Sequence, residues 1–164
     1  MIARRIGAWL VAGIAGSVTF WPAQVLAGGP TITAFIGNQI VSIGGYSKGL
    51  STLAGWAVHI AVRLAYAFLF GVIAAVLSRA SVAVSAVVTL VAALVLGWAT
   101  AVIAPPAISV TISLLGGQGW PAELFPPDFE LSLPLWNHLL FFLLNWMLQG
   151  LGLRLLPGGE VARP

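Results

Sequence analysis

Four long apolar stretches run along the chain, at about residues 6–27, 53–78, 82–104 and 135–156. Each reaches the roughly 20 residues that a helix needs to cross the roughly 30 Å hydrocarbon core of a bilayer. The runs are continuous, whereas the strands of a spanning β-barrel alternate apolar and polar residues over segments of about ten. The pattern therefore predicts an all-α integral membrane protein, built as a four-helix transmembrane bundle.

Two segments between these runs are expected to lie outside the membrane core. Residues 28–50 alternate apolar residues with Thr, Asn, Gln and Ser and are bounded by glycines, which favours either a short interfacial helix or a re-entrant piece. Residues 105–134 contain six prolines, and proline removes a helical hydrogen bond and clashes with the preceding turn. We therefore expect the third helix to stop at residue 104, with at most a turn or two at 107–115, and a Pro-rich loop on the outer surface.

The basic residues predict the orientation of these helices. Arginines flank the same ends of all four, namely Arg4, Arg5, Arg79, Arg154 and Arg163. The other side holds Lys48 and the acidic residues between 123 and 130. Because positively charged loops stay in the cytoplasm, both termini are predicted on the cytoplasmic side of a bacterial inner membrane. The start MIARRIGAWL also resembles a secretory signal, and we expect it to remain as an uncleaved signal-anchor helix.

Composition supports this class of protein and excludes several others. Of the 164 residues, 60% are hydrophobic and 7% are charged, against about 25% charged in a soluble domain. The length predicts one membrane domain. The net charge of +3 comes from scattered basic residues without the patch of a nucleic-acid-binding protein. The absence of cysteine excludes disulfides, thiolate metal sites and iron–sulfur clusters.

Small residues recur every four positions in two of the predicted helices. In 82–104 they are Ser85, Thr89, Ala93, Gly97 and Ala101. In 6–27 they are Ala8, Ala12 and Gly16, with Gly13 and Ser17 beside them. Because helices in lipid associate through close approach of their backbones, we expect these two faces to pack against each other.

The polar residues within the apolar runs form the candidate site, which comprises His59, Arg63, Tyr66, Asn137, His138, Asn145 and Gln149. The first three share one face of the second helix, and His138, Asn145 and Gln149 share one face of the last. Counting about 20 residues back from Arg79 places His59 near the outer end of its helix. His138 follows the start of the last helix by three residues, so both histidines are predicted at similar depth.

Arg63 is the charged member of this set. It is predicted about one turn inside the outer interface, where an arginine can snorkel outward. None of the four predicted helices contains an acidic residue. The counter-charge is therefore expected from a lipid phosphate, a ligand, another subunit, or one of the loop acids Glu123, Asp128 and Glu130.

Two interpretations of the site remain open. In the first, its residues are a polar packing cluster that fixes how the second and fourth helices dock, and no cofactor is bound. In the second, His59 and His138 ligate a b-type haem whose propionate pairs with Arg63. A variant of the second has His138 ligate the magnesium of a chlorophyll-type pigment.

The chain carries no HExxH, GxSxG, Walker or GxGxxG signature, and we therefore expect no enzyme activity. The predicted function is that of a structural or accessory membrane protein, acting within a larger complex or as a homo-oligomer. The alternatives are a haem or pigment carrier and a small channel or transporter, in which an anion would pass Arg63.

The stretches HIAVRLAYAFLFGVIAAVL and NHLLFFLLNWM, with a glycine-containing helix and a proline-bearing outer loop between them, resemble the YagU-like family of uncharacterised bacterial inner-membrane proteins. The resemblance covers about residues 56–155. It implies an inner-membrane protein associated with acid tolerance, and it supplies no catalytic residues.

Overall fold

The computed structural model describes residues 2–19, 21–26, 28, 30–77 and 81–155, and these residues form helices and connecting loops without a strand. The elements are α1 (Ile2–Thr19), α2 (Trp21–Leu26), α3 (Ile32–Gly44), the 3-10 turn η1 (Lys48–Leu50), α4 (Ser51–Leu77), α5 (Val82–Leu115) and α6 (Leu133–Leu155). The first predicted span is divided between α1 and α2. The predicted short helix within 28–50 is α3.

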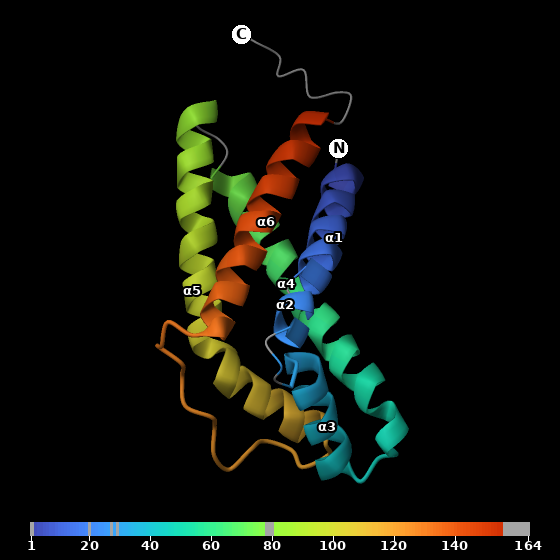
Figure 1. Cartoon of the computed structure of the whole chain (residues 1–164). Helices are drawn as coiled ribbons and strands as arrows, with labels where there is room; N and C mark the ends of the chain where they lie inside the picture. Colours follow the sequence, from blue (N-terminus) through green and yellow to red (C-terminus); the bar gives the residue numbers. More distant parts are fainter. Residues whose placement is uncertain (1, 20, 27, 29, 78–80, 156–164) are drawn as a thin grey trace.

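Three stretches of the described chain are long and apolar enough to cross a membrane, namely Arg5–Leu26, Lys48–Leu77 and Val84–Leu115. α6 is the remaining long helix. α1 and α6 run beside each other, and α4 crosses behind them (Figure 1). The start of α1, the end of α4, the start of α5 and the end of α6 lie at one end of the molecule.

That end is the one at which the sequence places five arginines. Arg79 and Arg163 lie outside the described residues, as do the side chains of Arg4 and Arg154. Arg5 is described and exposed. The helix directions thus bring together the four helix ends that the arginines flank.

α5 does not stop at residue 104, so that prediction was wrong. The helix continues through Pro105 and Pro106 to Leu115, and it changes direction sharply midway (Figure 1). Proline has no N–H, so the carbonyl four residues before it loses its helical partner. The Val102 carbonyl, four residues before Pro106, accepts the backbone N–H of Asp128 instead, at 3.3 Å. The loop thus supplies the hydrogen bond that Pro106 cannot make.

The bend turns the second half of α5 toward α3. Ile36 and Ile40 of α3 and Ile112 of α5 form a buried apolar cluster. α3 begins at a hydrogen bond from the Ala34 N–H to the Thr31 hydroxyl, at 3.2 Å, which satisfies one of the free donors of the first turn. These elements form the lower layer of the molecule in Figure 1.

The two stripes of small residues do not meet, because α1 and α5 are not in contact within the described chain. α6 lies between them. A side chain at Gly16 would collide with the ring of Phe141, and one at Gly97 would meet the Leu139 backbone. Both stripes therefore pack against α6. A groove lined by small residues can accept the bulky side chains of a neighbouring helix as well as a second small-residue face.

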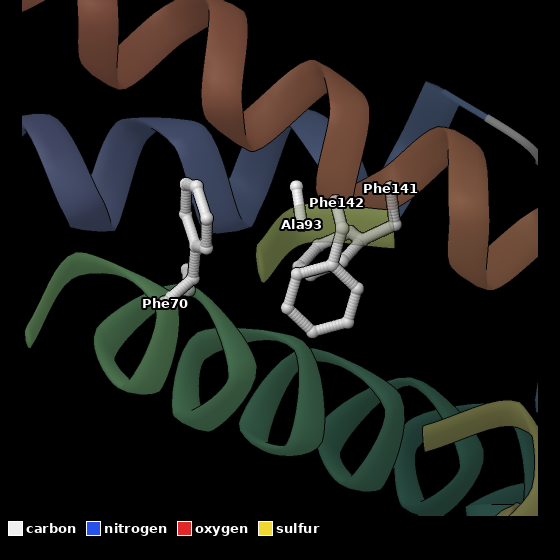
Figure 2. Packing of buried hydrophobic residues seen from close by; sticks show 5 residues of the cluster. Phe70, Ala93, Phe141 and Phe142 are labelled. Atoms are coloured by element: carbon white, nitrogen blue, oxygen red, sulfur yellow. The ribbon is translucent and has the colours of Figure 1, made fainter. Parts of the chain in front are cut away.

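Aromatic rings fill the space between α4, α5 and α6. Figure 2 shows Phe70 extending from α4 and Phe142 extending from α6 into the space between these two helices, with Ala93 of α5 nearby. The Phe70 and Phe142 rings lie 6.2 Å apart at an interplanar angle of 77°, and the Phe141 and Phe142 rings lie 5.3 Å apart at 87°. Such edge-to-face pairs contribute about 0.5–1.5 kcal/mol each beyond the area they bury.

α3 and α4 cross at close range through two glycines, Gly37 and Gly55. A methyl group at Gly55 would collide with the Thr33 carbonyl, and one at Gly37 with the Ser51 carbonyl. In both cases the obstacle is backbone, which cannot rotate aside. α3 is therefore held against α4 at a distance that only glycine permits.

We predict that Gly55→Ala lowers the free energy of unfolding of the detergent-solubilised protein by about 1–3 kcal/mol, the usual cost of overpacking. The matched control is Gly7→Ala in α1, where a methyl group meets no atom within 4 Å. Alanine there favours the helix by up to ~1 kcal/mol. Thermal unfolding followed by circular dichroism measures the stability of both variants. A Gly55→Ala variant as stable as the wild type would show that the α3–α4 crossing tolerates a side chain.

Candidate functional site

A cavity of about 660 Å³ lies among α3, α4, α5, α6 and the Pro-rich loop. Its volume is within the range of about 300–1,000 Å³ typical of small-molecule sites. Most of its wall is apolar. Its polar lining residues are Gln24, His59, Arg63, Tyr66, Thr111, Asp128, Asn137 and His138.

Five of the seven residues predicted for the site therefore line one cavity: His59, Arg63, Tyr66, Asn137 and His138. They reach it from α4 and α6, on either side of the bend in α5. The other two, Asn145 and Gln149, lie further along α6 and do not line it. The predicted set thus divides into cavity residues and residues packed deeper between the helices.

Arg63 is buried rather than extended toward the interface, and it is only 3% exposed. Its guanidinium carbon lies over the ring of Phe141, 4.5 Å from the ring centroid. The Nη1 atom is buried and has no hydrogen-bond partner among the described residues. A buried arginine stays protonated, so Arg63 gives the cavity lining a positive charge, and one of its nitrogens has no hydrogen-bond partner among the described residues.

Asp128 is the one loop acid of the three predicted counter-charges that lines this cavity. Its carboxylate is bonded within the loop. Oδ1 accepts the Glu130 N–H and Oδ2 accepts the Ser132 hydroxyl, both at 2.9 Å. The acid thus orders the turn before α6 and forms no ion pair with Arg63 in the described structure.

His59 of α4 forms a hydrogen bond with α1. The Nε2 atom of His59 lies 3.1 Å from the Ser17 carbonyl, and its ring meets that of Trp56 edge to face at 5.9 Å. Since a carbonyl only accepts hydrogen bonds, Nε2 of His59 donates its proton in this contact. In the neutral imidazole the unprotonated nitrogen is then Nδ1.

His138 of α6 forms a hydrogen bond with α5. The Nδ1 atom of His138 lies 2.9 Å from the Thr100 hydroxyl, which also lies 2.6 Å from the Leu96 carbonyl. A hydroxyl has one proton, and the Leu96 carbonyl can only accept. When Thr100 donates to Leu96, His138 donates through Nδ1 and presents Nε2 as an acceptor.

A side-chain amide forms a hydrogen bond between α6 and α4, while His138 contacts α4 through the Tyr66 ring at 5.9 Å. The Gln149 Nε2 group donates to the Ala67 carbonyl of α4 at 3.2 Å and lies 3.4 Å from Oδ1 of Asn145. Asn145 in turn donates to the Phe141 carbonyl at 2.9 Å. Both amides are almost fully buried, and these hydrogen bonds satisfy polar groups that would otherwise be unpaired in the interior.

Thr100 and Gln24 were not among the predicted site residues. Thr100 follows Ala93 by seven residues and Gly97 by three, so helical spacing placed it on the small-residue face. Gln24 accepts the Ile32 N–H at 3.0 Å and thereby orders the start of α3. No sequence pattern indicated that contact.

The cavity satisfies part of what a bis-histidine haem requires. Both imidazoles and a cation line it. Iron needs an unprotonated nitrogen from each histidine, and His59 offers only Nδ1 while Nε2 donates to Ser17. Haem ligation through Nε2 of His59 would require that interhelical hydrogen bond to break.

Comparison with protein-family models, with curated proteins and with solved structures gives no match for this chain. The resemblance to the YagU-like family stays a prediction.

We predict that Thr100 and His138 are energetically coupled. Thr100→Val and His138→Ala together should destabilise the protein by about 0.6–1.7 kcal/mol less than the sum of the two separate effects, as for other hydrogen bonds between membrane helices. A double-mutant cycle on unfolding in mixed micelles measures the coupling. Thr111→Val is the control, because that hydroxyl donates to the Ala107 carbonyl of its own helix; coupling of equal size to Thr111 would refute the specific contact.

Proposed function

We propose that the chain is a non-catalytic structural or accessory protein of the bacterial inner membrane, with four spanning helices and both termini in the cytoplasm. The spans would be α1 with α2, α4, α5 and α6. The length and composition of three of them support this proposal. The common position of the four arginine-flanked helix ends supports the orientation.

The observation that carries the proposal is the distribution of polar and apolar side chains. Asn145, Gln149 and Arg63 are almost fully buried. Large apolar side chains are exposed along one face of α5, including Val84, Val87, Val91, Leu94, Val95 and Trp98. Water would disfavour that face, whereas lipid tails are as apolar as leucine and accept it.

The accessory role is supported by what the interior polar groups do. Ser17, Thr100 and Ala67 supply oxygen atoms to side chains of neighbouring helices. These contacts fix helix positions. We accordingly propose that the chain contributes a stable helical unit to a larger membrane complex or to a homo-oligomer.

A haem carrier is the second candidate, because His59, His138 and Arg63 line the same cavity. In that case one haem would bind between α4 and α6. Arg63 would hold a propionate, as cationic side chains do for anionic groups.

The orientation predicts opposite labelling of two single-cysteine variants, which the cysteine-free chain makes simple to prepare. Ala3→Cys in α1 and Ala122→Cys in the Pro-rich loop both replace exposed residues. A membrane-impermeant maleimide applied to intact spheroplasts should label Cys at 122, and label Cys at 3 only after lysis. The reverse pattern would invert the topology, and labelling of both in intact spheroplasts would contradict a spanning α1.

The haem candidate predicts an absorption spectrum. Protein purified in mild detergent should show a Soret band and a sharp reduced α band, and both should vanish in His59→Ala and in His138→Ala. The accessory role predicts a featureless visible spectrum from protein expressed with ample haem. Retention of the bands in either variant would exclude ligation by both histidines.

A further inference from the structure

Arg63 contributes a positive charge to the cavity lining, and it forms no ion pair with another described residue. The guanidinium carbon lies over the Phe141 ring, 4.5 Å from its centroid. This cation–π contact is attractive, but it supplies no oxygen acceptor to the N–H donors of the guanidinium. Its Nη1 atom is buried and has no hydrogen-bond partner among the described residues.

Among the described residues that line the cavity, Asp128 is the one acidic side chain, and it forms no ion pair with Arg63. His59 and Tyr66 of α4 line the cavity, and so do Asn137 and His138 of α6. None of these is an anion at neutral pH when unperturbed. Asp128, which the loop contributes, has its carboxylate bonded to Glu130 and Ser132. A buried charge without a partner is costly, and an acceptor with negative charge would remove that cost.

The remaining wall determines what else such a molecule must carry. Phe35, Ile36, Val58, Ile108 and Leu133 line the cavity from α3, α4, α5 and α6. Burying apolar surface against them is favourable by about 25 cal/mol per Å² relative to water. A small hydrophilic anion would leave this wall uncovered, and a neutral lipid would leave Arg63 unpaired.

We propose that the cavity binds an amphipathic molecule with a single anionic head, whose carboxylate or phosphate oxygens pair with Arg63 and whose alkyl part lies against the apolar wall. Arginine forms two parallel hydrogen bonds with either type of head. Tyr66 and Asn137 carry hydroxyl and amide groups in the same wall and are placed to complete the head's hydrogen bonding. Two sources supply this chemistry: a free amphipathic acid and the headgroup of a membrane phospholipid.

The test uses the full chain purified in a neutral detergent, with oleic acid, methyl oleate and dioleoyl phosphatidic acid as probes. Thermal unfolding reports binding, because a ligand that binds only the folded state raises Tm. Oleic acid or phosphatidic acid should raise the Tm of the wild-type protein, and methyl oleate should not. A response to oleic acid alone assigns a free acid, and a response to phosphatidic acid alone assigns a lipid headgroup.

The variants distinguish pairing of the anionic head with Arg63 from general effects of the probes on the detergent micelle. Arg63→Met should weaken binding by about tenfold or more, as expected for loss of a charge-assisted contact, and should be at least as stable as the wild type without ligand. Arg63→Lys should bind with intermediate affinity. Arg5→Met removes an exposed arginine from α1 and should respond as the wild type does.

Two results would overturn the proposal. The first is an equal Tm rise with oleic acid and methyl oleate in the wild-type protein, which needs no variant to fold. The second is an equal response of wild type and Arg63→Met to the anionic probes. Because purified protein is used, both results are independent of the topology and of the accessory role proposed above.

Discussion

Phe141 is the side chain on which the arrangement of the helices depends. Its ring occupies the space that Gly16 leaves open on α1, and it contacts Tyr66 of α4 and Phe142 of its own helix. The guanidinium of Arg63 covers its face. One ring thus contacts α1, α4 and α6 and also lies against the guanidinium of Arg63 in the cavity lining. A smaller side chain here would leave a gap beside Gly16 and would also remove the ring against which the Arg63 guanidinium lies.

The long helices were predictable because their apolar runs are continuous and reach the length that a membrane-spanning helix needs. The end of α5 was not predictable, because the effect of Pro106 depends on a distant group. A proline excludes helix when the carbonyl that it leaves without a partner stays unsatisfied. Here the Asp128 N–H reaches the Val102 carbonyl, and nothing local in the sequence indicates that a loop residue 26 positions from Val102 returns to it.

The pairing of the helices shows a similar limit. Stripes such as Ala93 and Gly97 indicate where a helix can be approached closely, and they do not indicate which helix approaches. Likewise, depth and helical spacing were enough to bring His59 and His138 to one cavity. Their partners, Ser17 and Thr100, depend on how α1 and α5 are rotated, and rotation is set by the packing of all the helices together.

The proline pair in α5 also determines where the cavity can change its size. Ala101, Ala104 and Pro105 belong to its wall, and this is the turn in which the helix has given up internal hydrogen bonds. Bending a helix elsewhere requires intact backbone bonds to stretch, whereas bending here requires little more than movement of the Asp128 contact. The wall is therefore easiest to deform where α5 passes from α6 to α3, and a small change of helix angle at this single turn would change the width of the cavity.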